Sequence, residues 1–193
     1  MAKPNIIKKA QLIEAAKQCV IENGIESLTF RSLAAKANVS QGTIYHHFQS
    51  KERLMIEIIE NISETSWEKL GNISNSKQFV NDALSSALSR QQSNSSFHQL
   101  FLSLVVMSLH NKQMKNKISN LIKIENDNLS NILHKLDKDQ WIEGVSHEHL
   151  AILLNSLIDG IAIQSLTVEN FPTEEIFESL YKLFSLLINI KGD

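Results

Sequence analysis

Residues 29–51 read TFRSLAAKANVSQGTIYHHFQSK, and this stretch decides the fold. It predicts two short helices, because Thr29 is a suitable N-cap for the first and Ser40 for a second that ends near Phe48. Asn38 lies in the tight turn between them, where asparagine tolerates a left-handed backbone better than most residues. Two short helices joined by such a turn predict a helix-turn-helix.

A miniature core and a polar first turn support this interpretation. Small Ala34 and Ala35 lie where the two helices must pack closely. The second helix begins with small polar residues, so its backbone can approach base edges in a major groove. Free N–H groups at its start, and at the start of the next helix, favour phosphate oxygens. We expect the core to consist of Leu33, Val39, Ile44 and Phe48, together with Leu12 and Ala16 from a preceding helix.

Helical spacing continues through the rest of the chain. It predicts an all-α fold of about nine helices, with an N-terminal three-helix helix-turn-helix head and a C-terminal helical body. We divide the chain into a DNA-binding domain over 1–50 and a ligand-binding and dimerisation domain over 51–193. Besides the two short helices, we expect helices over 7–23, 50–71, 76–90, 96–110, 111–136, 146–166 and 172–190.

Charge and composition add bounds. Residues 1–56 carry eight Lys and Arg against four Asp and Glu, whereas the remainder carries eleven against seventeen. A basic head on an acidic body is typical of a polyanion-binding module attached to a non-binding domain. The single cysteine, Cys19, excludes an intramolecular disulfide and indicates a reducing compartment. The start lacks an apolar leader, and the apolar stretch 100–109 is too short to span a bilayer, so we expect a cytoplasmic protein.

Three segments carry a family resemblance: AA-x3-V-x3-G, T-x3-LA-x2-A-x-VSQGTIY-x2-F and SKE-x-L. They closely resemble the N-terminal signature of the tetracycline-repressor (TetR) family over residues 8–54. Asn38 stands where the family usually has Gly, and Cys19-Val20 where it often has Leu-Phe. The text LIDGIAIQSL, from Leu157, is similar to the family's dimerisation helix, though less specifically. The resemblance implies a transcriptional regulator, in the first instance a repressor, that binds a palindromic operator as a homodimer and is released by a small molecule.

The resemblance also implies roles for residues of the head. Thr29 and Arg31 would hold backbone phosphates, and Lys51 would grip phosphate at the start of the following helix. Gln41 and Thr43 would be the base readers, and a planar amide such as that of Gln41 can bond adenine bidentately, whereas a hydroxyl or ammonium near phosphate adds affinity for any sequence. The remaining groove-facing or phosphate-contacting positions would be Ser40, Gly42, Tyr45, His46 and His47. The alternative for Tyr45 is a place in the core. The alternative for His46 and His47 is that they are surface residues without a contact to DNA.

The last two long helices favour dimerisation. The helix from Leu150 is apolar nearly all round, and a helix of that kind needs cover on more than one side. Pairing with the last helix across a two-fold axis would form a four-helix interface. The alternative is that both are buried within a monomer. The expected interface residues are Leu153, Leu157, Ile161, Phe177, Tyr181 and Phe184.

Polar residues that interrupt apolar stripes predict an effector site in the body. If Glu125 and Asp159 face a cavity, a cationic or amine-bearing amphipathic effector is favoured; Asp159 has an alternative role across the dimer. The alternative for the aromatic candidates is that they fill the hydrophobic core and line no cavity. The full set of candidate pocket residues is Trp67, Phe97, Phe101, Met107, Glu125, Asn126, Asn155, Asp159 and Gln164.

Other function classes find less support. No nucleophile, base and orienting residue can be assembled, so we expect no catalytic site, and no cofactor or metal. His147 and His149 sit on opposed sides of a helix start, which favours exposed residues over metal ligands. Cys19 fits a small core residue rather than a redox site. Two alternatives remain: a ligand-blind DNA-binding protein, recognised by a body without a cavity, and a helical carrier or enzyme with a vestigial head, recognised by failure to bind DNA.

Overall fold

The computed structural model describes residues 8–91, 97–136 and 141–190. Over these residues the chain is all-helical, with nine α-helices, one 3-10 turn and no strand, which confirms the expected fold class. The elements are α1 (Lys9–Asn23), η1 (Ile25–Ser27), α2 (Phe30–Lys36), α3 (Gln41–Phe48), α4 (Lys51–Gly71), α5 (Ser76–Ser89), α6 (Phe97–Ser108), α7 (Lys112–Leu136), α8 (His147–Thr167) and α9 (Thr173–Ile190).

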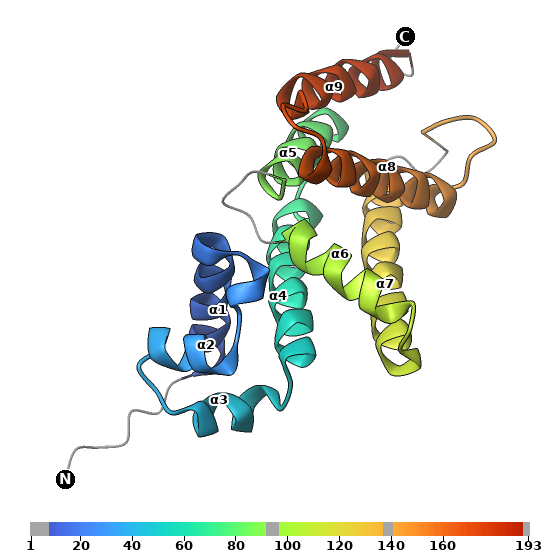
Figure 1. The fold of residues 1–193 in the computed structure, drawn as a ribbon. Helices are drawn as coiled ribbons and strands as arrows, with labels where there is room; N and C mark the ends of the chain where they lie inside the picture. The colour runs from blue at the N-terminus through green and yellow to red at the C-terminus, as the bar shows by residue number, and fades with distance from the viewer. Residues whose placement is uncertain (1–7, 92–96, 137–140, 191–193) are drawn as a thin grey trace.

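The helices form a small head and a larger body joined by α4 (Figure 1). Helices α1, α2 and α3 lie together at one end, with α3 turned across the foot of the head. Helix α4 runs from this end into the body, where α6 and α7 lie beside it and α8 crosses α7. Helix α9 packs against α5 at the opposite end from α3. A single continuous helix, α4, therefore connects the end of the head that carries α3 to the body.

Local signals in the sequence set the helix ends of the head. The hydroxyls of Thr29, Ser40 and Ser50 accept hydrogen bonds from backbone N–H groups in the first turns of α2, α3 and α4. Asn38 has a φ of 53°, so the predicted turn position is confirmed, and Gly24, with a φ of 75°, ends α1. The predicted helix over 96–110 begins at Ser96, which lies outside the described residues.

The predicted head core is confirmed with one correction. Leu12, Ala16, Leu33, Ile44 and Phe48 are fully buried, and Val39 packs against them while partly buried. Ala34 is buried at the contact between α2 and α3. Ala35 was expected at that contact but is exposed, because it falls on the opposite side of the short α2.

The head core continues into the body through α4. Leu54, Ile58 and Ile59 are fully buried in the same hydrophobic cluster as the head residues. That cluster also takes in buried residues of α6 and α7, among them Leu100 and Ile118. The head and the near end of the body thus share one apolar core, and two further clusters fill the far end of the body.

Helix α8 is the most exposed apolar element of the body. By length and composition alone it could cross a bilayer, and here one of its sides packs against α7. Leu150, Ala151 and Ala162 are buried on that side. Five of its large apolar side chains are exposed in the protomer: Ile152, Leu153, Leu157, Ile163 and Leu166.

Two of the expected interface residues need correction. Ile161 is 5% exposed and Phe177 is 4% exposed, because both pack in the cluster between α5, α8 and α9 of their own chain. Their side chains are therefore not available to a partner. Tyr181 and Phe184 are half-buried against the body core, whereas Leu153 and Leu157 lie open.

Candidate DNA-binding surface and body cavities

Helix α3 presents a polar face over an apolar one. Ile44 and Phe48 are fully buried and fix the helix on the head. Ser40, Gln41, Gly42 and His46 are exposed, and Tyr45 is 61% exposed, while Thr43 and His47 are half-buried. The Tyr45 ring meets the Phe30 ring edge-on, with centroids 6.3 Å apart. Tyr45 is therefore a surface residue and not part of the core.

The first turn of α3 has a defined hydrogen-bond pattern. Ser40 Oγ accepts from the Thr43 backbone N–H at 3.1 Å and lies 3.0 Å from Thr43 Oγ1. A Cβ placed on Gly42 would meet only Ser40 Oγ, at an ordinary contact distance of 3.5 Å. The fold therefore does not require glycine here. A glycine in the first turn instead leaves the backbone open to close approach by another molecule.

The expected phosphate contacts lie at two helix starts. Thr29 and Arg31 are exposed at the start of α2, and Arg31 has no acidic partner among the described residues. Lys51 is half-buried at the start of α4, and its Nζ donates to the Ile25 carbonyl at 3.3 Å. Lys51 therefore also ties α4 to the 3-10 turn of the head.

Other bases of the head are paired with acids. Glu57 forms two ion pairs: its Oε2 lies 2.7 Å from Lys9 Nζ, and its Oε1 lies 3.3 Å from Arg53 Nε. Glu22 pairs with Lys36 at 2.6 Å. These pairs neutralise charge on α1, the end of α2 and α4. At the start of α2, Arg31 therefore keeps a positive charge that no acidic side chain among the described residues neutralises.

The body contains an apolar cavity of about 90 Å³. Trp67 from α4 and Phe184 from α9 lie in its wall, and Arg90 and Asn155 are its polar lining residues. The other walls are mainly Leu70, Phe79, Val80, Ala83, Leu84, Leu129, Leu133, Trp141, Leu150, Leu154 and Ile158. This composition suits an apolar ligand with a few fixed polar contacts.

A second, smaller cavity of about 40 Å³ is polar. It shares Arg90, Asn155 and Ile158 with the apolar cavity, so the two adjoin at these residues. Its remaining lining consists of Phe97, His98, Phe101, Leu121, Ile122, Glu125, Asn126 and Asp159. The Asn155 side-chain amide donates to Asn126 Oδ1 at 2.8 Å, at the junction of α7 and α8.

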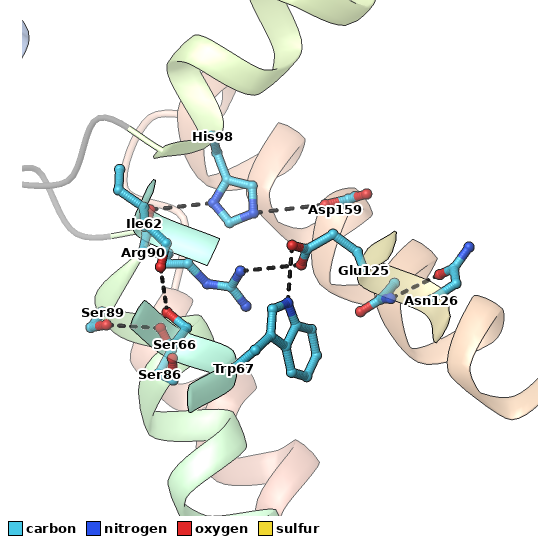
Figure 2. Close-up of polar contacts among 11 residues, drawn as sticks. Ile62, Ser66, Trp67, Ser86, Ser89, Arg90, His98, Glu125, Asn126 and Asp159 are labelled. Carbon is cyan, nitrogen blue, oxygen red and sulfur yellow. Dashed lines mark hydrogen bonds and ion pairs between the residues drawn. The ribbon is translucent and has the colours of Figure 1, made fainter. Parts of the chain in front are cut away.

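Two charged groups, Arg90 and Glu125, meet at the polar cavity (Figure 2). Trp67 Nε1 donates to Glu125 Oε1 at 3.0 Å, and Arg90 Nη1 lies 4.0 Å from Glu125 Oε2. The Arg90 guanidinium lies over the Phe97 ring, 4.9 Å from its centroid, and Arg90 Nε has no hydrogen-bond partner within the part of the chain that the structure describes. Glu125 thus connects α4, α5 and α7 within one contact.

His98 and Asp159 form the other half of this cluster (Figure 2). His98 Nδ1 lies 3.2 Å from the Arg90 carbonyl oxygen, and its Nε2 lies 3.7 Å from Asp159 Oδ1. Burial, and next the nearby Arg90 charge, lower the pKa of His98 to about 4. Burial raises the pKa of Asp159 to about 6, against the opposing effect of Arg90. His98 is therefore neutral at pH 7.

Most of the expected pocket residues come together. Trp67 lines the apolar cavity, Asn155 lines both, and Phe97, Phe101, Glu125, Asn126 and Asp159 line the polar one. Met107 and Gln164 line neither cavity. Both are exposed, because they fall on the outer sides of α6 and α8.

Sequence reasoning missed Arg90 and His98. Arg90 caps the C-terminus of α5, and His98 interrupts the apolar α6. An isolated histidine in an apolar helix was a usable signal for a buried polar contact. Nothing local in the sequence marks Arg90 as buried, because its cover comes from α4, α6 and α7.

The expectation for His147 was wrong. It is buried, with its ring 5.2 Å from that of His134 at 77°, because the start of α8 packs against the end of α7. His149 is exposed as expected. Among the described residues, no group of three or more His, Cys, Asp and Glu side chains could hold a metal ion.

The head matches a known family. The sequence model of "Bacterial regulatory proteins, tetR family" matches residues 12–58. The regulator QacR of Staphylococcus aureus is 34% identical over 61 residues, which are 32% of this chain and 32% of QacR. The match to such curated relatives thus spans about a third of their length. These relatives are named as transcriptional regulators.

Solved structures share the fold over nearly the whole chain. A putative TetR-family regulator from Rhodococcus sp. has a TM-score of 0.73 at 14% identity, over 91% of this chain and 95% of that one. FadR from Bacillus subtilis, in complex with stearoyl-CoA, has a TM-score of 0.64 at 22% identity, over 92% of this chain and 97% of that one. Identities this low show the common fold alone.

Proposed function

We propose, from the premise that this chain belongs to the TetR family of bacterial regulatory proteins, that it is a ligand-responsive transcriptional regulator of the cytoplasm. It would bind a palindromic operator as a homodimer and act first of all as a repressor. A small molecule bound in the body would release it from the DNA. The observation that carries this proposal is α4, which begins beside α3 and brings Trp67 into the wall of the body cavity.

The surface of α3 supports DNA binding. Its buried side anchors it on the head core, and its open side offers Gln41 and Thr43 to base edges. Arg31 and Lys51 at neighbouring helix starts suit phosphates on either side. Thr29, Ser40, Gly42, Tyr45, His46 and His47 complete the proposed contact surface.

The exposed apolar face of α8 supports a homodimer. Leu153 is 60% exposed and Leu157 is 42% exposed, and a face of such side chains is stabilised by burial against a second copy. A recognition helix covers only half of a palindromic site, so a dimer also fits the proposed DNA geometry. Leu153→Glu would place a charge in this interface. It should shift the protein toward monomer in analytical ultracentrifugation. Val106→Glu, at an exposed position of α6, should not.

The continuity of α4 supports ligand control. Any movement of Trp67 is transmitted along a rigid helix to Lys51, which adjoins α3. Two recognition helices bind together only if their separation matches about one turn of DNA, roughly 34–36 Å. An effector need only bind the mismatched spacing more tightly. A difference of about 1.4 kcal/mol lowers operator affinity tenfold.

Selection of bound DNA from a random pool, followed by a screen for compounds that release it, tests the proposal. The effector should lower operator affinity without dissociating the dimer, and saturating operator should lower effector affinity by the same factor. Equal effector affinity with and without operator would rule out this mechanism. A ligand-blind regulator finds less support, since the body has cavities and buried charges that a purely structural core does not need.

A further inference from the structure

The polar cavity is lined by acceptors that face one another. The Arg90 carbonyl can only accept, so the hydrogen between it and His98 must come from Nδ1. In the neutral ring, Nε2 then carries a lone pair and no hydrogen. This lone pair lies 3.7 Å from Asp159 Oδ1, which is another acceptor when the carboxyl is ionised. The His98 side chain is 3% exposed, so water has little access to it.

The charges around the cavity leave an excess of negative charge. Glu125 and Arg90 are opposite charges 4.0 Å apart and largely offset one another. Asp159 remains as a further carboxylate in the lining, with a side chain that is 40% exposed and with His98 neutral beside it. A cation entering here would meet a carboxylate that forms no ion pair with a Lys or Arg side chain among the described residues. A carboxylate entering here would be repelled by Glu125 and Asp159 and attracted by Arg90 alone.

We propose that the effector is an amphipathic amine, whose protonated nitrogen donates N–H hydrogen bonds to His98 Nε2 and Asp159 while its apolar part fills the adjoining cavity. This inference rests on the proposed function, because it takes these cavities as the effector site. An ammonium with hydrogens supplies both things that the cavity lacks: a positive charge beside Asp159 and donors for two facing acceptors.

The polar cavity and the apolar cavity adjoin, as the two ends of an amphipathic molecule require. The amine end lies between α6 and α8, where His98 and Asp159 meet. The apolar end reaches the larger cavity across the shared residues Asn155 and Ile158. Trp67 lies in that second cavity and bonds Glu125 at the rim of the first. An effector that occupies both cavities therefore touches the end of α4 in the body.

Direct binding to the full chain without DNA tests the chemistry. Four amphiphiles with an unbranched eight-carbon chain and different ends serve as probes: octylammonium, octyltrimethylammonium, octanol and octanoate, whose eighth carbon is the carboxylate carbon. We expect octylammonium to bind about tenfold more tightly than octanol and octyltrimethylammonium, and octanoate to bind most weakly in calorimetric titrations. The tetraalkyl probe has the charge without N–H donors, so it separates charge from hydrogen bonding.

Matched variants locate the site. Asp159→Asn keeps the shape and removes the charge, and should weaken octylammonium about tenfold while leaving octanol unchanged. The control is Asp127→Asn on α7, where the exposed carboxylate pairs with Lys123 and lines neither cavity. It should leave all four affinities as they are.

Several results would overturn the proposal. Tightest binding by octanoate would assign the polar end to Arg90, and equal binding of octanol and octylammonium would leave only an apolar site. Octyltrimethylammonium as tight as octylammonium would remove the N–H donors from the argument. Binding by none of the four would remove the cavities as a site for amphiphiles. Octylammonium that binds as expected but leaves operator affinity unchanged would support the site and contradict the proposed function.

Discussion

The head and the body of this protein are built on opposite principles. In the head, short helices with capped ends surround a core of fully buried side chains, and the polar groups of interest lie outside it. In the body, apolar side chains lie exposed on α8, and charged groups such as Arg90 lie inside beside cavities. A head of this kind holds one shape for recognition. A body of this kind retains free energy that a ligand or a second copy can still gain.

The largest expected effect separates the two kinds of packing. Phe48→Ala should destabilise the protein by about 3–5 kcal/mol, because it opens a cavity in a filled core. Phe184→Ala should cost less, about 1–2 kcal/mol, because Phe184 is half-buried and already borders a cavity. Urea denaturation at one protein concentration measures both. Equal losses would mean that the body is packed as tightly as the head.

The second effect concerns charge inside the body. The pKa of His98 falls from 6.5 to about 4 on folding, so stability should be lost as pH drops from about 6.5 to 4. The pKa of Asp159 rises from 3.8 to about 6, so its effect is opposite: stability is lost as pH rises across about 4 to 6. The groups facing this pair are Arg90 on α5 and Glu125 on α7.

Because the two slopes oppose, the parent should show a shallow profile in this range. Asp159→Asn should uncover the His98 slope, a loss of up to about 3 kcal/mol between pH 6.5 and 4. Urea midpoints measured across this pH range, with Asp127→Asn as control, check it. A flat profile in Asp159→Asn would mean that His98 is not desolvated in the folded protein.

The third effect returns to the head and concerns base recognition. Gln41 is exposed in the first turn of α3, and its amide can bond a base edge bidentately. Gln41→Ala should relax preference at one base pair in each half-site, by about 1–3 kcal/mol. Selection from random DNA measures the profile, and Gln78→Ala, an exposed amide of the body, is the matched control. A profile identical to the parent's would make Gln41 a bystander.

The fourth effect asks whether Lys51 binds DNA or only holds the head. If its ammonium contacts phosphate, Lys51→Ala should weaken all operators about equally and reduce the salt slope of binding by about one. If it serves only the Ile25 carbonyl, thermal stability should fall and the slope should stay. Titrations across salt concentrations decide, with Lys69→Ala at the body end of α4 as control.

The smallest effect sets folding against binding at one residue. Gly42 has room for a Cβ, so Gly42→Ala should stabilise the fold by up to about 1 kcal/mol. The same methyl group would stand between the α3 backbone and the bases, so operator affinity should fall. Thermal melts and DNA titrations of one preparation test both. Unchanged affinity would place the groove contact elsewhere on α3.

The contrast also explains what could be predicted from the sequence. The caps at Thr29 and Ser40, the turn at Asn38 and the buried Ile44 follow from neighbours within a few residues. The corrections in the head are small, such as exposed Ala35, since a seven-residue helix has only one buried side.

Prediction was weaker in the body, where side chains meet from distant helices. Glu125 and Asp159 were expected near a cavity, but Arg90 was not expected to offset Glu125, because that pairing joins the ends of α5 and the middle of α7. Apolar Ile161 and Phe177 gave the same sequence signal as Leu153. Which apolar residue faces its own core and which faces outward depends on the crossing of α5, α8 and α9.

The shared core has a consequence for recombining such proteins. A chimera joined at Ser50 would exchange α1–α3 but keep Leu54 and Ile58, whose fully buried side chains complete the head core. The foreign head would then have to accept two core residues from another sequence. A crossover after Ile59 would carry these contacts with the head, leaving the new seam among the body contacts of α4. Exchange of DNA specificity between relatives should therefore succeed more often inside the fourth helix than at the loop before it.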